Sequence, residues 1–282
     1  MTTVKAMTKN YDLKTVKGFG EEWARFDQSK LSDMERSNIF NQYFSIFPWE
    51  KLPKNAVGFD LGCGSGRWAP LVAPRVTELH CIDPSEKALE VARKALISFP
   101  NVYLHLTSVD AIPLSDGSMD FGYSLGVLHH VPNTFKGICS CSAKLKPGAP
   151  FLLYLYYALD NRPLWFRAIF FLTQGVRRTI SKLPQGPKNF LCQVIAACLY
   201  YPLAKCSKIL EKIGISVRNF PLSFYRDKSF FVMQTDALDR FGTRLEQRFT
   251  QGEIQNMMKA AGFTDIKFSN REPYWVAVGI KQ

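Results

Sequence analysis

The stretch Val57-Gly-Phe-Asp-Leu-Gly-Cys-Gly-Ser-Gly-Arg67 decides the fold of this 282-residue chain. A short apolar segment ends at Asp60, and glycines follow at positions 62, 64 and 66. Glycines after a hydrophobic strand let the backbone approach a ligand where a Cβ atom would collide. The dinucleotide pattern G-x-G-x-x-G would need a glycine at position 67, where this chain has arginine. The stretch therefore predicts a strand followed by a ligand-binding turn of another kind.

A second acidic residue follows at the distance that a ribose-binding carboxylate requires in a β-α-β unit, about 20 residues after the turn. Leu79-His-Cys-Ile-Asp83 reads as a short apolar strand that ends in this acid. Pro84 comes next, and Ser85 can cap the helix that begins at Glu86. The two acids thus mark the ends of two successive strands.

Strand and helix patterns alternate beyond this unit, which predicts a mainly parallel sheet with helices on both faces. The expected strands are residues 56–61, 77–82, 101–107, 119–124, 149–157, 264–269 and 274–280. A helix is expected from Thr250, with Glu253 completing a capping box and Gly262 ending it.

The order of these motifs resembles class I S-adenosylmethionine-dependent methyltransferases, in their broad type-11-like branch. The pattern D-x-G-C-G-x-G begins at Asp60, an acid follows the second strand, and Val127-Leu-His-His-Val131 follows the fourth. The resemblance covers residues 55–157 and resumes near 249–280. It implies a Rossmann-like seven-stranded α/β sheet whose last strand is antiparallel. It also implies S-adenosylmethionine as cofactor and S-adenosylhomocysteine as product.

The resemblance assigns the cofactor residues position by position. Asp60 would orient the loop, Asp83 would accept the ribose hydroxyls, and the segment around Ser108 would contact the adenine. That segment departs from the commonest family form, so its contacting group stays open. The expected cofactor-binding residues are Asp60, Gly62, Cys63, Gly64, Gly66, Asp83, Pro84, Ser85, Ser108, Val109, Asp110, Ser124, Leu125 and Gly126.

His129 and His130 are the candidates for acid–base chemistry. A neutral imidazole can take a proton from a hydroxyl or amine as that group is methylated. The alternative is that the pair is a structural element after the fourth strand. No further cluster at ligand spacing indicates a metal site, so none is expected.

The chain divides into four expected parts. Residues 1–54 form a helical leader, 55–157 the cofactor-binding core, 158–248 a helical insertion that caps the substrate site, and 249–282 complete the core. Phe19, Trp23 and Phe26 lie on one helical face of the leader. That face either packs on the core or acts as a lid, and in the second case Trp23 contacts the substrate.

The insertion is too apolar for a disordered segment and too long for a loop. Helices are expected from Leu164 to Leu172 and from Phe190 to Leu210, the second interrupted by Pro202. The longest apolar stretch, Phe190 to Ala204, is too short to span a bilayer. The insertion should therefore cap the carboxyl edge of the sheet, where open α/β sheets bind ligands.

Charge is concentrated in this insertion. The chain carries a formal net charge of +12, and residues 158–228 hold twelve basic and three acidic residues, an excess of nine. Either this is a solvated basic face, or it places the acceptor near an anionic group or surface. The expected acceptor-binding residues are Trp23, Tyr156, Tyr157, Arg162 and Arg226, although Arg226 can equally pair with Asp227.

The favoured activity is methyl transfer to a small or carrier-linked acceptor, above all a hydroxyl of a sugar or a polar anionic metabolite. The alternatives are sulfur, nitrogen or carbon acceptors, including a quinone-like lipid. A nucleic-acid substrate is disfavoured because no RNA-binding module is recognisable. A non-catalytic protein at a membrane surface is disfavoured by the intact loop and Asp83.

Partners and compartment follow from the same features. Peripheral contact with an anionic membrane and a homodimer through the cap are both open. Seven cysteines without paired metal-ligand spacing, and no apolar signal segment near Met1, predict a reducing cytoplasm, with the inner membrane face as an alternative.

Overall fold

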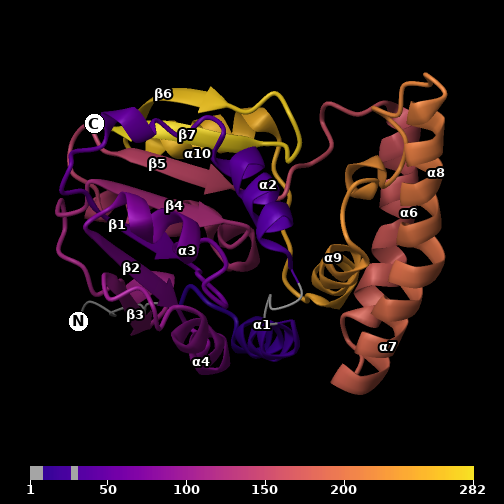
Figure 1. Cartoon of the computed structure of the whole chain (residues 1–282), viewed down its shortest axis with the longest axis horizontal. Helices are drawn as coiled ribbons and strands as arrows, with labels where there is room; N and C mark the ends of the chain where they lie inside the picture. The colour runs from indigo at the N-terminus through magenta and orange to yellow at the C-terminus, as the bar shows by residue number, and fades with distance from the viewer. Residues whose placement is uncertain (1–8, 27–30) are drawn as a thin grey trace, which may run out of the picture.

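A seven-stranded sheet forms the centre of the computed structural model, which describes residues 9–26 and 31–282 (Figure 1). The strand order is β3-β2-β1-β4-β5-β7-β6. The strands are β1 (Val57–Leu61), β2 (Glu78–Asp83), β3 (Val102–Leu106), β4 (Phe121–Leu125), β5 (Pro150–Tyr154), β6 (Phe263–Phe268) and β7 (Val276–Lys281). Strand β7 runs antiparallel to β5 and β6, while the other pairs are parallel. This arrangement confirms the expected Rossmann-like sheet.

Helices pack on both faces because successive strand residues point to opposite sides. One face buries Phe121 and Tyr123 beneath Phe40 and Phe44 of the leader. The other face buries a separate apolar cluster around Phe151. The helices around the sheet are α1 (Leu13–Arg25), α2 (Asp33–Phe44), α3 (Ala69–Val72), α4 (Glu86–Ala95), α5 (Thr134–Lys144) and α10 (Gln251–Ala260). The expected capping box of α10 is present between Thr250 and Glu253.

A helical cap stands beyond the carboxyl ends of the parallel strands (Figure 1). It contains α6 (Leu164–Ile180), α7 (Gln185–Ile195), α8 (Tyr201–Lys212) and α9 (Phe230–Gly242). Helix α9 packs against α6, α7 and α1, so it connects the outer helices to the core. Its Met233 and Phe241 are buried with Tyr200 in a third apolar cluster.

The cap departs from the sequence-based expectation in three places. Pro202 does not interrupt a helix, because a π-helical turn at Ala196–Tyr200 precedes it and joins α7 to α8. Helix α6 runs on to Ile180, where the buried Arg177 donates hydrogen bonds to backbone carbonyls at the end of α9. Helix α9 was not expected, because its buried face becomes visible only from the packing around it.

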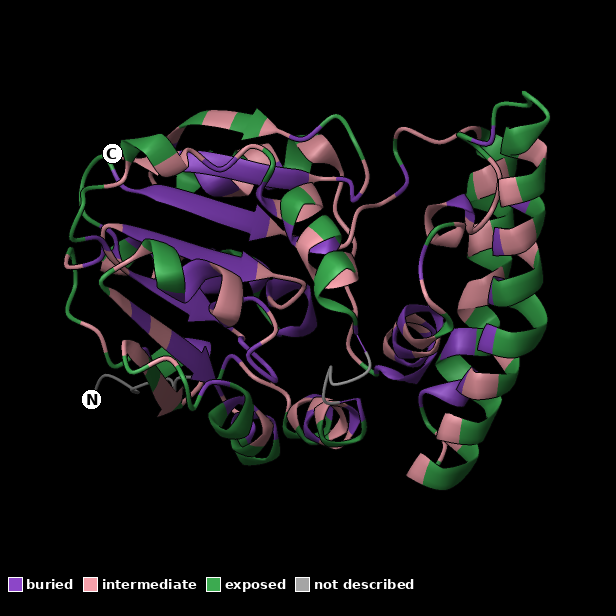
Figure 2. Ribbon diagram, in the orientation of Figure 1, coloured by how far each residue is buried: buried purple, intermediate pink, exposed green. Residues whose placement is uncertain are grey.

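The joined helix Gln185–Lys212 is the one candidate membrane span that length and composition give within the described residues. Only 28% of its most apolar window is buried inside the protein. Figure 2 shows this unequal burial, since the central strands β1, β4 and β5 are mostly purple whereas much of α6, α7 and α8 is green. The cap therefore carries far more exposed apolar surface than the core.

Candidate active site

The glycine-rich turn after β1 has the backbone geometry that its sequence predicts. Gly62 and Gly64 adopt φ values of 78° and 54°, in the left-handed region that favours glycine. A Cβ atom on Gly62 would lie 2.3 Å from the Val127 side chain, and one on Gly64 would lie 2.9 Å from Trp23 Nε1. The turn thus fits closely between the loop after β4 and helix α1.

Asp83 holds this turn against the start of α4. Its Oδ2 accepts a hydrogen bond from the Gly64 backbone at 2.9 Å, and its Oδ1 accepts one from Ser85 at 2.8 Å. Burial raises the pKa of Asp83 to about 6, although both backbone hydrogen bonds favour the charged form. Each oxygen keeps a second lone-pair direction, so the carboxylate can still accept from a ligand hydroxyl.

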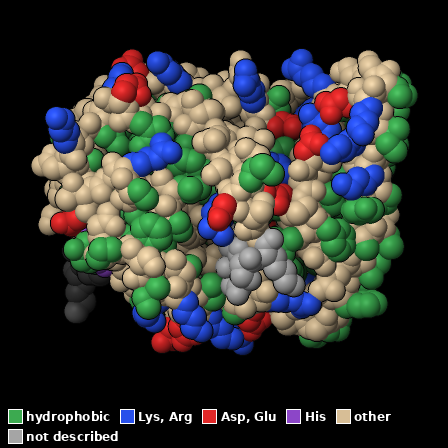
Figure 3. All heavy atoms as spheres, viewed as in Figure 1, with side chains coloured by type: hydrophobic (Ala, Val, Ile, Leu, Met, Phe, Trp, Pro, Cys, Tyr) green, Lys and Arg blue, Asp and Glu red, His purple; other side chains and the backbone are tan. Residues whose placement is uncertain are grey.

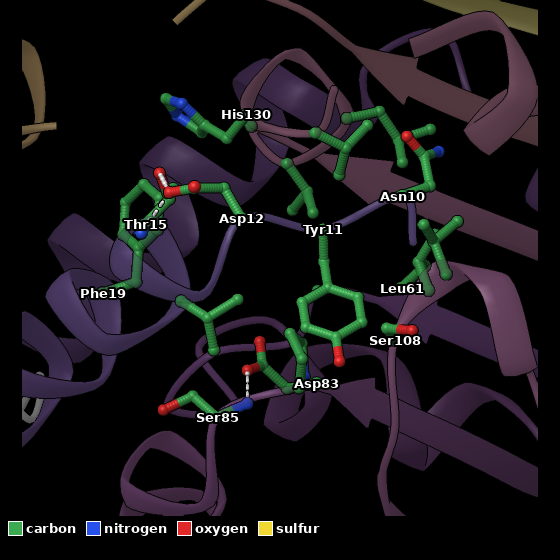
Figure 4. A pocket seen from close by; sticks show the side chains of 18 of the residues that line it. Asn10, Tyr11, Asp12, Thr15, Phe19, Leu61, Asp83, Ser85, Ser108 and His130 are labelled. Atoms are coloured by element: carbon green, nitrogen blue, oxygen red, sulfur yellow. Dashed lines mark hydrogen bonds between the residues drawn. The ribbon is translucent and has the colours of Figure 1, made fainter. Parts of the chain in front are cut away.

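A cavity of about 120 Å³ lies above the turn, between β1, β4 and helix α1. Figure 4 shows the Tyr11 ring projecting into it between Asp83 and Ser108. Gly126 lies at the wall with φ 78° and open space where a Cβ would stand. Of the residues expected to bind cofactor or substrate, this cavity is lined by Trp23, Gly62, Asp83, Pro84, Ser85, Ser108, Val109, Leu125 and Gly126.

The other expected cofactor residues do not line this cavity. Burial raises the pKa of Asp60 to about 8, partly offset by the adjacent Tyr123 hydroxyl. Ser124 donates to the Leu61 carbonyl at 3.1 Å. Asp110 pairs with Lys136 at 3.0 Å and accepts from the Asn10 backbone. The remaining residues of this group, Cys63, Gly64 and Gly66, shape the turn from within.

Helix α1 supplies wall residues that the sequence analysis did not assign to the cofactor. Asp12 caps the helix by accepting from the Thr15 backbone at 2.8 Å. Phe19 and Trp23, from the aromatic stripe, face the cavity. The stripe was the available signal for Phe19, whereas nothing in the sequence indicated Tyr11. Asn10, Tyr11, Asp12, Thr15, Val16 and Phe19 are the leader residues added in this way.

The two histidines differ in position. Both lie in the 3₁₀ turn Leu128–His130 after β4, but only His130 lines the cavity. The His129 ring is fully buried and stacks on Tyr156 at a centroid distance of 3.9 Å. Burial lowers the pKa of His129 well below its usual value. His129 therefore has a packing role in this arrangement.

The hydrogen bonds of His130 define its reactive nitrogen. Its Nδ1 lies 2.7 Å from the Leu245 carbonyl, which can only accept, so Nδ1 carries the proton. Burial lowers the pKa of His130 to about 4, so the ring is neutral near pH 7. Nε2 is left with a free lone pair and lies 3.7 Å from Asp239 Oδ1. This nitrogen is buried and has no hydrogen-bond partner within the described residues. A neutral imidazole with such a free lone pair can act as a general base toward a group that reaches it.

Asp239 of α9 lies between His130 and Tyr156. The Tyr156 hydroxyl donates a hydrogen bond to Asp239 Oδ2. Burial raises the pKa of Asp239 to about 6, while the Tyr156 hydrogen bond opposes that rise. Residues 236–248 carried no motif that assigned them a role from the sequence, so this carboxylate was missed.

A second cavity of about 200 Å³ lies between the sheet edge and the cap. Ten of its nineteen described lining residues are aromatic: Tyr43, Tyr154, Tyr156, Tyr157, Phe166, Phe170, Phe220, Phe224, Tyr225 and Tyr274. Tyr156 lines this cavity and His130 lines the first, with ring centroids 5.6 Å apart. The two cavities therefore adjoin at the His130–Tyr156 contact.

Among the described residues, three arginines line this second cavity: Arg162 and Arg248 form ion pairs with glutamates, whereas Arg240 lies over the Phe170 ring, 4.7 Å from its centroid. Arg162 pairs with Glu272 and donates to the Tyr157 hydroxyl at 3.2 Å. Arg248 pairs with Glu246 at 2.8 Å. Arg226, which was also expected to bind the acceptor, lines neither cavity and instead pairs with Glu211 at 2.8 Å and with Asp227 at 3.7 Å.

Comparison with known proteins identifies the core. Residues 59–153 match the family model described as "Methyltransferase domain". A ubiquinone biosynthesis O-methyltransferase of Azoarcus sp. (strain BH72) is 33% identical over 133 residues, which cover 46% of this chain and 54% of that protein. The protein of the same name from Hahella chejuensis is 29% identical over 182 residues, covering 63% and 73%. The chain thus spans about half the length of the first of these curated relatives.

A solved structure extends the likeness in fold over most of the chain. A chain from the complex between the Trm112 methyltransferase activator of Haloferax volcanii and a methyltransferase superposes with a TM-score of 0.50. The identity is 13%, and the superposition covers 93% of this chain and 96% of that one. At this identity the likeness concerns the fold alone.

Proposed function

We propose that this chain, which belongs to the class I S-adenosylmethionine-dependent methyltransferases, methylates a hydroxyl group on an aromatic, quinone-like acceptor. The observation that carries the proposal is the junction of two cavities. One is built on the glycine-rich turn and Asp83, the other is lined by aromatic rings, and they adjoin at His130 and Tyr156. A donor and an acceptor bound in these cavities would approach each other there.

The residues of the first cavity fit S-adenosylmethionine. Gly126 leaves open space where a side chain would obstruct a ligand, and Gly62 lets the turn pack closely against Val127. Asp83 would hold the ribose hydroxyls, Ser108 and Val109 would lie beside the adenine, and Leu125 and Gly126 beside the methionine part. When bound, this cofactor supplies a methyl group already activated by its sulfonium charge.

The protein then has three tasks. Helix α1 shields the donor cavity from water with Phe19 and Trp23. His130 Nε2 takes the proton of the acceptor hydroxyl. Asp239 stabilises the imidazolium that forms, since its carboxylate lies 3.7 Å from that nitrogen.

The choice of acceptor differs from the one favoured by the sequence. The sequence favoured a sugar or a polar anionic metabolite because of the basic cap. The findings favour the quinone-like alternative, because the curated relatives are named for ubiquinone biosynthesis and aromatic rings dominate the acceptor cavity. The arginines of this cavity are engaged within the protein: Arg162 pairs with Glu272, Arg248 shares Glu246 with Arg177, and Arg240 lies over the Phe170 ring.

Calorimetric titration with S-adenosylmethionine and S-adenosylhomocysteine tests the donor cavity. A radiolabelled methyl-transfer assay then compares a catechol carrying an isoprenoid tail, the same catechol without a tail, a thiophenol and a phosphorylated sugar. We expect cofactor binding and transfer to the catechols. Transfer to the sugar without transfer to either catechol would refute the proposed acceptor, and failure to bind the cofactor would refute the activity.

A further inference from the structure

The outer side of the cap exposes an unusual amount of apolar surface. Fourteen of the twenty-one large apolar side chains that are exposed among the described residues lie between Leu164 and Ile215. The most exposed six are Leu164, Phe171, Leu172, Phe190, Ile209 and Ile213, with 62–78% of their surface accessible. These six define what we call the outer cap face. Figure 3 shows apolar side chains gathered along the edge of the molecule that the cap forms, at the right of the view.

The outer cap face is not part of the packing that holds the cap together. The inner sides of α7 and of the π-helical turn are covered by packing, since Cys192, Ala196 and Tyr200 are buried in the apolar cluster that α9 forms. The apolar residues of the outer cap face make no comparable contact with the described residues. Contiguous exposed apolar surface of this kind marks a site of interaction with another body.

Positive charge accompanies the apolar side chains. Arg167, Arg178, Lys182 and Lys212 are exposed on the same helices and their ends, and none of them forms an ion pair within residues 9–26 and 31–282. The acids nearby are already engaged, because Glu211 pairs with Arg226 and Asp227 with Lys208. The unneutralised charge of this surface is therefore positive.

We propose that the outer cap face lies in the headgroup region of an anionic lipid bilayer, with α6 and the joined helix α7–α8 parallel to the membrane. Exposed aromatic and aliphatic side chains with flanking Lys and Arg are the combination that binds such an interface. A second copy of the chain fits less well, because a two-fold interface would bring the same cations together.

The helix α7–α8 lies on the bilayer and does not cross it. Crossing would strip Tyr200 and Ala204 from their packing against the rest of the cap. It would also carry Lys205 and Lys208, near the last turns of α8, toward the hydrocarbon. Parallel docking keeps the inner side packed and leaves the long cationic side chains at the headgroups.

The same face leads toward the acceptor cavity. An open groove lined by Leu164, Arg167, Phe171 and Leu172 shares Leu159 and Phe170 with the aromatic cavity. If the acceptor is lipid-linked, which rests on the proposed function, this groove gives its tail a path between bilayer and active site. The docking itself does not depend on that activity.

Flotation of the full chain with phosphatidylcholine vesicles, with and without phosphatidylglycerol, tests the proposal directly. We expect flotation with the anionic vesicles at low salt and a decrease at high salt. The double variant Phe171→Glu/Leu172→Glu should lower the partition coefficient by about tenfold or more, since it replaces two side chains that would enter the interface. Arg178→Gln/Lys182→Gln should weaken binding to anionic vesicles only.

Ile97→Glu is the matched control, because Ile97 is 85% exposed but lies on the core and outside the outer cap face. It should float like the wild type. Retained cofactor affinity in each variant shows that the fold and the donor cavity are intact. Absence of flotation with any vesicle, or flotation of the double-glutamate variant at the wild-type level, overturns the proposal. So does a lipid-free dimer, seen by light scattering, that this double variant dissociates.

Discussion

Replacement of Asp239 by asparagine is the strongest test of the proposed proton acceptor. The substitution keeps the shape of the side chain and its contact with Tyr156, but it removes the negative charge beside His130. Opposite unit charges 3.7 Å apart attract by about 4 kcal/mol at an effective dielectric constant of about 20. That attraction develops only when His130 becomes protonated, so it stabilises the transition state and not the resting enzyme.

The assay is steady-state methyl transfer to the preferred catechol. We expect kcat to fall by about 10³-fold, with nearly unchanged affinity for S-adenosylmethionine. The wild-type rate should also rise with pH through about 6, because the raised pKa of Asp239 keeps its carboxyl protonated below that point. The asparagine variant should lose this dependence.

Asp116→Asn is the matched control, since Asp116 is an exposed carboxylate that pairs with Lys144 on the core. His130→Ala should lower kcat by roughly 10²–10⁴-fold, and the double variant should be little worse than His130→Ala alone. If the kcat of Asp239→Asn lies within about threefold of the wild-type value, the reasoning is refuted, because a change that small shows no loss of transition-state stabilisation. Full activity of His130→Ala would leave positioning alone as the mechanism.

Three further predictions concern the core. Asp83→Ala removes the acceptor of two backbone hydrogen bonds and of the expected ribose contact. Calorimetry should therefore show that S-adenosylmethionine binds more weakly by about 1.5–3 kcal/mol. Unchanged affinity in a folded variant would contradict the assignment. Gly62→Ala places a Cβ atom 2.3 Å from the Val127 side chain at a residue with positive φ, so the thermal midpoint of this variant should fall and cofactor binding should be lost. Gly117→Ala is the control, because Gly117 also has a positive φ but open space around it, and this variant should retain cofactor binding. The raised pKa of Asp60, about 8, means that its protonated form stabilises the fold at low pH and that this contribution is lost as pH rises through about 8. Urea unfolding from pH 6 to 9 should therefore show a loss of stability in the wild type that Asp60→Asn lacks, and equal slopes in both proteins would contradict this.

The sequence determined the sheet and the donor side of the site. Glycines at 62, 64 and 66 and an acid at position 83 are local signals, because their roles depend on backbone conformation and on distance along the chain. The strands could be placed to within three residues of their observed ends for the same reason. The central strands β1, β4 and β5 are short, mainly apolar runs of five residues, and such runs can be recognised without knowledge of distant contacts.

The tertiary structure alone decided the acceptor side. Asp239 lies beside His130 only because α9 packs between the outer cap helices and α1. No local sequence pattern predicts a contact between residues so far apart along the chain. The same packing separates the two histidines, since it buries His129 against Tyr156 and turns His130 toward the cavity. It also determines which apolar residues of α6, α7 and α8 are covered by α9 and which remain on the outer cap face. A sequence records how apolar a helix is, but the surface that its neighbours leave uncovered depends on how the folded elements pack together.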